Sequence, residues 1–117
     1  MRVPVFRKIN SFWYKINKIN TKKVNMGKSR IHVVITGRVQ GVGFRYSAFA
    51  EAVRLGLKGW VRNTYDNRVE GVFEGDDEIV NSMLNWCRSG PSMAHVTHVE
   101  VDKLPYKGEF ESFRITR

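Results

Sequence analysis

"IHVVITGRVQGVGFRYSAFAEAVRLG" (residues 31–56) changes its hydrophobic pattern halfway along. Its first seven residues form a β-branched apolar run closed by Gly37, which predicts an inner strand over 31–37. From Phe44 the apolar residues recur at helical spacing until Gly56, so we expect a helix over 44–56. The nine residues that join the two, 37–45, contain three glycines and two arginines.

The rest of the chain also alternates between strand-like and helix-like segments. Residues 57–64 and 68–75 are strand-like, and the turn between them contains Asp66 and Asn67, which tolerate the positive φ of a tight hairpin. The remaining elements are expected as a helix over 76–91 and strands over 95–101 and 110–117. The order β-α-β-β-α-β with a final strand predicts an α+β fold. The expected architecture is a ferredoxin-like two-layer α/β sandwich, in which two helices cover one face of an antiparallel sheet.

The excess positive charge lies in the first thirty residues. The chain of 117 residues suits one globular domain, and its formal charge is +9. Residues 1–30 contain nine Lys or Arg and no acid, whereas residues 31–117 contain eleven bases and eleven acids. A neutral domain lacks the broad basic face of a nucleic-acid-binding protein, so no nucleic acid is expected as a partner. We predict a basic N-terminal extension over 1–30 and a domain over 31–117.

Two interpretations of the extension remain open. Its apolar residues between Phe6 and Ile19 recur at spacings of three or four, which is typical of a basic amphipathic helix for a membrane surface, nucleic acid or import machinery. Alternatively it is an accessory or unintended extension, because Met26 offers a second start just before the first strand. We favour the second interpretation and expect poor order there.

Cysteine content and hydropathy restrict the compartment. Cys87 is the single cysteine, so no internal disulfide can form and a reducing compartment is expected. No run approaches the about 20 apolar residues of a membrane span, and the first residues lack the apolar core of a secretory signal. These features predict a cytoplasmic protein that is not bound to a membrane, and we expect a monomer.

The glycine-rich loop also has two interpretations. A strand-to-helix loop can turn several backbone N–H groups toward one point, where the helix dipole favours an anion such as phosphate. Gly41 and Gly43 allow left-handed dihedrals at little cost, and the Arg45 guanidinium can bind phosphate oxygens in a bidentate manner. The loop matches neither the nucleotide P-loop nor the dinucleotide fingerprint. From these residues alone, an anion cradle and a connecting loop with solvated arginines both remain open.

Several segments together resemble the acylphosphatase family. They are GRVQGVGFR (37–45), LKGWVRN (57–63), VEGVFEG (69–75), GPSMAHVTHVEV (90–101) and FRI (113–115). The resemblance covers residues 31–117 and implies a hydrolase that converts an acyl phosphate to a carboxylate and inorganic phosphate. It also implies the ferredoxin-like sandwich and no metal or cofactor. The same module occurs in a larger hydrogenase maturation factor, whose zinc-finger cysteines are absent from this sequence.

The resemblance assigns roles to particular residues. The phosphate-binding loop corresponds to Gln40, Gly41, Val42, Gly43, Phe44 and Arg45. Arg45 corresponds to the phosphate-binding arginine, and Asn63 to the asparagine that positions the attacking water. The expected partners are an acyl phosphate substrate and inorganic phosphate or sulfate as a bound product or inhibitor.

These residue types suffice for the reaction. The conjugate acid of a carboxylate leaving group has a pKa of about 4, so the group departs at neutral pH without a general acid. Phosphoryl transfer depends mainly on positioning and on stabilising charge on the equatorial oxygens, which a fixed guanidinium and several N–H groups provide. Asn63 is a weak base and is expected to orient water; the acceptor of the proton is not identified by the sequence.

No metal site is expected. His95 and His98 have no further Cys or His to complete a tetrahedral set, and the acids at 76–78 suit a helix start. His32 is expected at the surface. The two tryptophans of the domain, Trp60 and Trp86, are expected as core or rim aromatics, because no RNA-recognition signature accompanies them.

Overall fold

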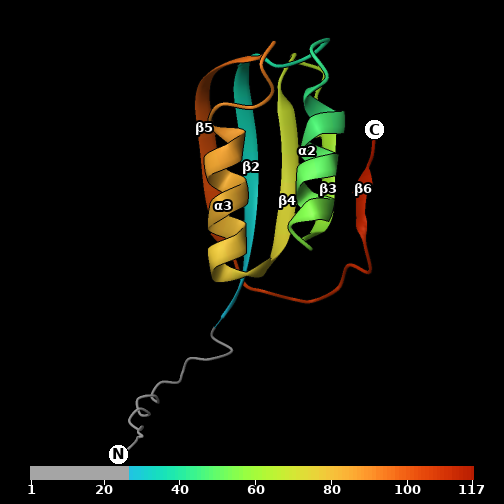
Figure 1. The fold of residues 1–117 in the computed structure, drawn as a ribbon, viewed down its shortest axis with the longest axis vertical. Coiled ribbons are helices and arrows are strands. Elements are labelled where there is room, and N and C mark those ends of the chain that lie inside the picture. Colours follow the sequence, from blue (N-terminus) through green and yellow to red (C-terminus); the bar gives the residue numbers. More distant parts are fainter. Residues whose placement is uncertain (1–26) are drawn as a thin grey trace, which may run out of the picture.

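The computed structural model describes residues 27–117. The predicted poor order of the N-terminal extension lies outside the described residues for all but its last positions. In Figure 1 the helices lie side by side on one face of the five-stranded sheet. This arrangement confirms the predicted α+β sandwich and its element order.

The elements are β2 (Lys28–Arg38), α2 (Phe44–Arg54), β3 (Lys58–Asn63), β4 (Val69–Asp76), α3 (Asp77–Cys87), β5 (His95–Leu104) and β6 (Phe113–Ile115). Their order across the sheet is β5-β2-β4-β3-β6. The pairs β5·β2, β2·β4 and β4·β3 are antiparallel, as expected, whereas β6 adds to β3 in parallel. The hairpin turn between β3 and β4 contains Asn67 with a φ of 69°, which confirms the expected positive φ.

The core lies between the helices and the inner face of the sheet. Alternate residues of β2, namely Ile31, Val33 and Ile35, are at most 2% exposed and face the helices. Helix α2 contributes Phe44, Ala48 and Ala52, and α3 contributes Val80, Met83 and Cys87. Since burial of a Val, Ile or Phe side chain contributes about 1.5–3 kcal/mol, this periodicity fixes which face of each element points inward.

A buried ion pair fastens the connection between β5 and β6 to the outer face of the sheet. Glu74 on β4 is 2% exposed and accepts hydrogen bonds from Arg30 Nη1 at 3.1 Å and from the backbone N–H groups of Lys107 and Gly108 at 3.0 and 3.3 Å. The ring of Phe110 lies 5.1 Å from the Arg30 guanidinium. In Figure 1 this connection crosses one end of the sheet and delivers β6 to the edge beside β3.

Across residues 27–117, no helix is long and apolar enough to cross a membrane.

Candidate active site

Two glycines with left-handed backbone conformation shape the loop between β2 and α2. Gly41 has a φ of 74°, and Gly43, which immediately precedes α2, has a φ of 79°. A Cβ at either position would meet no atom within 4 Å, so glycine is needed here for its backbone conformation and not for space. Among the described residues no side chain caps the start of α2. The first N–H groups of the helix are therefore available to an anion.

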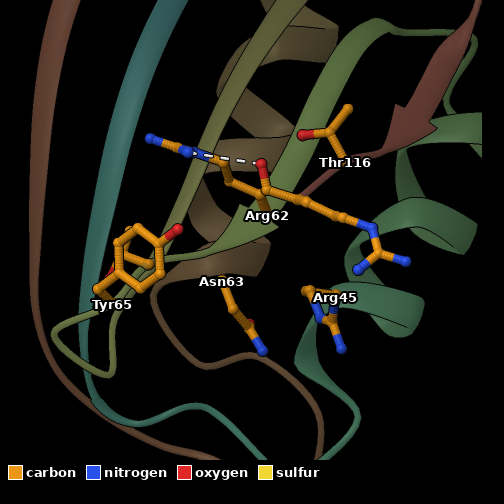
Figure 2. A pocket seen from close by; sticks show the side chains of 7 residues that line it. Arg45, Arg62, Asn63, Tyr65 and Thr116 are labelled. Carbon is orange, nitrogen blue, oxygen red and sulfur yellow. Dashed lines mark hydrogen bonds between the residues drawn. The ribbon is translucent and has the colours of Figure 1, made fainter.

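Arg45 and Asn63 face the same space from two different elements. Arg45 lies in the first turn of α2, and Asn63 is the last residue of β3. Figure 2 shows both side chains extending toward the same opening. Both residues line two cavities, of about 410 and about 220 Å³, and the smaller is also lined by Gly41 and Gly43. The fold thus brings the glycine-rich loop, the arginine and the asparagine together.

The polar groups of Arg45 and Asn63 are left without a partner by the rest of the described chain. Over residues 27–117, no carboxylate forms an ion pair with Arg45. The Asn63 Oδ1 atom is buried and has no hydrogen-bond partner in the described part of the chain. Leaving a buried acceptor unpaired costs about 1–3 kcal/mol, and buried polar groups without a partner are rare. An anion beside Arg45 and a water that donates to Asn63 Oδ1 would satisfy both groups.

The Gln40 side chain fastens the loop to the β3–β4 turn. Its Nε2 atom donates to the backbone oxygens of Thr64 and Arg68, each at 2.9 Å. The turn is closed by the bond from Thr64 N to Arg68 O at 2.8 Å. Because Thr64 directly follows Asn63, this contact fixes the loop relative to the asparagine.

The side chains of Thr64 and Asp66 stabilise the same turn. Thr64 Oγ1 donates to Asp66 and accepts from the backbone N–H of Arg68 at 3.0 Å. Hydrogen bonds from Arg68, at 2.6 and 3.0 Å, and from Thr64 lower the pKa of Asp66 from 3.8 to about 2. Asp66 is therefore ionised at neutral pH and accepts these bonds.

The larger cavity extends away from the glycines toward the C-terminal end of β6. Besides Arg45 and Asn63, its walls are formed by Arg62, Thr64, Tyr65, Thr116 and Arg117. Tyr65, at the tip of the hairpin, is fully exposed. Figure 2 places Thr116 and Tyr65 on opposite sides of the Arg62 position. This cavity is therefore a polar space, open to solvent, next to the loop.

The Arg62 guanidinium is held from the outer face of the sheet. Its Nε atom donates to Glu70 Oε1 at 2.7 Å, and its Nη1 atom donates to the backbone oxygen of Arg117 at 3.5 Å. The other carboxylate oxygen of Glu70 lies 2.6 Å from His32 Nε2. Burial opposes ionisation of Glu70, but the hydrogen bonds from His32 and Arg62 keep its pKa below the ordinary value.

The structure adds detail to the other residues predicted for the site. Phe44 is 1% exposed, with its ring edge-on to Trp86 at 5.4 Å, and Val42 packs against the core. Since the Gln40 side chain is also engaged, these three residues can offer an anion only their backbone. The sequence reasoning missed Arg62, Thr116 and Arg117, whose only signal was the position of Arg62 beside Asn63.

The histidines and acids do not assemble into a metal-binding group. In the described part of the chain, no three or more His, Cys, Asp or Glu side chains are placed to hold a metal ion. His95 and His98 both lie on β5, and the acids Asp77 and Glu78 occupy the first turn of α3 as expected.

Comparison with known proteins identifies a family for this chain. The family model described as Acylphosphatase matches residues 31–115. The chain is 49% identical over 90 residues to the acylphosphatase of Pelotomaculum thermopropionicum, an alignment that covers 77% of this chain and 98% of that relative. Among solved structures, an acylphosphatase from Coxiella burnetii superposes with a TM-score of 0.75 at 31% identity, covering 82% of this chain and all of the other. The acylphosphatase from Bacillus subtilis gives 0.73 at 34% identity, over 76% of this chain and 99% of the other.

Proposed function

The chain belongs to the acylphosphatase family and is an acylphosphatase. From this premise we propose which role each site residue has in the hydrolysis of an acyl phosphate. Residues 40–45 bind the phosphate group of an acyl phosphate, Arg45 stabilises its charge, and Asn63 orients the attacking water. The observation that carries this proposal is the buried Asn63 Oδ1, which has no hydrogen-bond partner among residues 27–117 and lies in the wall of a cavity shared with Arg45 and the loop glycines.

The loop binds the phosphate through its backbone. The first N–H groups of α2 have no partner within the helix, no side chain of residues 27–117 caps them, and the helix dipole favours a negative charge at that point. Gly41 and Gly43 provide the left-handed backbone that shapes the loop in front of them. Arg45 adds a guanidinium that can contact two phosphate oxygens at once. Negative charge on the equatorial oxygens in the transition state is then stabilised without metal chemistry, which is why we propose a metal-independent enzyme.

Asn63 positions the attacking water molecule. Its Oδ1 atom accepts a hydrogen bond from a water molecule and aims the oxygen of that water at phosphorus, opposite the acyl group. A bond forms from the water oxygen to phosphorus while the bond from phosphorus to the bridging oxygen breaks. Both electrons of the broken bond leave with the carboxylate. The two protons of the water remain on the phosphate, so a dianionic substrate gives one carboxylate and one dihydrogen phosphate.

The remaining proposals concern the setting of the enzyme. We infer that the catalytic domain predicted over residues 31–117 begins with strand β2 at Lys28, and that catalysis does not need the part of the predicted N-terminal extension (1–30) that precedes Met26. The lone Cys87 and the neutral charge of the domain are consistent with a cytoplasmic monomer that binds neither nucleic acid nor a membrane. Inorganic phosphate or sulfate is expected to bind the loop as product or inhibitor.

Hydrolysis of benzoyl phosphate in the presence of a chelator tests this proposal. The full chain and a chain that starts at Met26 are both expected to turn over the substrate at similar rates, and inorganic phosphate is expected to inhibit both. Loss of activity with the chelator would refute metal independence. Loss of activity on truncation would give the extension a catalytic role that the proposal denies.

A further inference from the structure

The position of Asn63 determines on which side of the phosphate the acyl group lies. In an in-line displacement the attacking water and the leaving group occupy opposite sides of phosphorus. If Asn63 orients the water, as proposed above, the acyl group lies on the side of the cradle away from Asn63. In the smaller cavity Asn63 is contributed by β3, whereas the other described lining residues belong to the segment 39–46. The acyl group therefore leaves the phosphate on the side of the loop and the start of α2.

Tyr46 is a large, exposed side chain on that side. It is the third residue of α2, it is 70% exposed, and it lines the smaller cavity. Side chains on a helix lean toward the helix N-terminus, so Tyr46 covers the first turn of α2, where the anion is expected to bind. The buried residues of this helix are Phe44, Ala48 and Ala52, and within residues 27–117 the Tyr46 ring packs on no other aromatic ring. Packing of the domain therefore does not explain an aromatic residue at this position.

The wall of the smaller cavity is uncharged apart from Arg45. Its described lining residues include the apolar side chains of Val39 and Phe44, and none of them is Asp, Glu or Lys. A charged acyl group would lose hydration there without gaining a partner, because Arg45 is engaged with the phosphate. A flat, uncharged acyl group instead covers the exposed ring of Tyr46 and removes apolar surface from water.

We propose that Tyr46 forms the acyl-binding wall of the active site and that its ring favours acyl phosphates whose acyl part is flat and uncharged. Tyr46 is then a specificity-determining residue that contacts the acyl group and not the phosphate. Acyl groups too small to reach the ring are still hydrolysed, since the contacts to the phosphate remain.

Benzoyl phosphate and acetyl phosphate test this role, because one carries a flat ring and the other only a methyl group. For each variant the ratio of kcat/KM for benzoyl phosphate to kcat/KM for acetyl phosphate is measured. The difference in spontaneous reactivity between the two substrates cancels when a variant is compared with the wild type. Tyr46→Ala is expected to lower the ratio about three- to tenfold, mainly by raising KM for benzoyl phosphate. Tyr46→Phe keeps the ring and is expected to keep the ratio.

Tyr65→Ala is the matched control, because it removes a ring of the same size from the water side of the site. Tyr65 is fully exposed at the tip of the β3–β4 turn and lines the larger cavity. In Figure 2 it lies on the far side of Asn63 from Arg45. Tyr65→Ala is therefore expected to keep the wild-type ratio. Both tyrosines are exposed, so the variants are expected to fold, and melting curves check this.

Inhibition by inorganic phosphate separates contact with the acyl group from support of Arg45. Phosphate has no acyl group, so its inhibition constant in Tyr46→Ala is expected to stay within about twofold of the wild type. If Tyr46 only held Arg45 in place, both substrates and inorganic phosphate would bind more weakly, and the ratio would not change.

The inference and the proposed function fail in different ways. A ratio that stays at the wild-type value in Tyr46→Ala, or that falls equally in Tyr65→Ala, overturns the acyl-binding role of Tyr46 while both substrates are still hydrolysed. If instead Arg45→Gln continues to hydrolyse both substrates, the assignment of the phosphate site is wrong.

Discussion

Replacing Gln40 with Ala tests whether the phosphate loop has to be held against the β3–β4 turn. The substitution removes two hydrogen bonds of 2.9 Å, from Nε2 to the backbone oxygens of Thr64 and Arg68. Each such bond contributes about 0.5–1.5 kcal/mol net. Arg68 O keeps its bond from Thr64 N at 2.8 Å, so the loss is concentrated on Thr64 O. We therefore expect unfolding free energy to fall by about 2 kcal/mol.

That loss corresponds to a Tm lower by about 8–16 °C for a domain of this size. The effect on turnover is expected to be larger than the effect on stability suggests. The loop is released from the residue that follows Asn63, and a displacement of about 1 Å between reacting groups costs on the order of a hundredfold in rate. Urea unfolding and benzoyl phosphate hydrolysis, both measured at a temperature where the variant is fully folded, separate the two effects.

Asn81→Ala provides the control, because Asn81 is exposed on α3 and far from these contacts. It is expected to change neither quantity appreciably. If Gln40→Ala unfolds like the wild type and keeps its kcat, the contact between the loop and the turn is not what positions the cradle, and the reasoning above is refuted.

Three further predictions concern single groups. Gly43→Ala places a Cβ on a residue with a φ of 79°, so it is expected to lower stability by about 1–2 kcal/mol and to weaken phosphate inhibition; normal inhibition would show that the loop tolerates another conformation. Burial raises the pKa of the Cys87 thiol from 9.0 to about 12, so its thiolate is about a thousandfold rarer than in the unfolded chain; a disulfide reagent at pH 8 should react with it only after urea is added. Hydrogen bonds lower the pKa of Asp66 to about 2, so its stabilising effect is complete above about pH 4 and is lost as the pH falls toward 2; urea titrations over that range should show less acid sensitivity in Asp66→Asn.

The sequence pattern predicted the boundary of a helix correctly where the backbone conformation of one residue determines it. The expected start of α2 at residue 44 is correct, because Gly43 adopts a left-handed conformation there. The expected end at 56 is two residues late. Leu55 caps the helix, and Gly56 turns away with a φ of 75°. Helix α3 similarly ends at Cys87, three residues before Gly90, whereas the Gly90-Pro91 pair predicts an end at residue 91.

Strand lengths depended on partners that the sequence does not reveal. Strand β2 begins at Lys28 and not at 31, because Lys28 pairs with Asp76 of β4. Strand β5 continues past 101 to Leu104, which pairs with Arg30. The final strand was expected over 110–117 but covers only Phe113–Ile115, since the preceding residues are used to cross the end of the sheet.

The same limit applies to the site. The roles of Arg45 and Asn63 were predicted from the resemblance, and nothing in the spacing alone showed that the two would line one cavity. The anchoring bonds of Gln40 and the contacts of Arg62 with Glu70 join residues 8 to 28 positions apart. Such contacts depend on strand register and on how loops meet, which hydrophobic periodicity does not encode.

The central claim is that Arg45 binds the phosphate while Asn63 acts on the water. Measuring both kcat for benzoyl phosphate and the inhibition constant of inorganic phosphate in Arg45→Gln and Asn63→Ala tests this claim most directly. The account predicts that Arg45→Gln loses both turnover and phosphate binding. In Asn63→Ala, kcat is expected to fall by at least about a hundredfold while phosphate still binds within about threefold of the wild type. An Asn63→Ala enzyme that turns over normally, or an Arg45→Gln enzyme that still binds phosphate and hydrolyses the substrate, would contradict it.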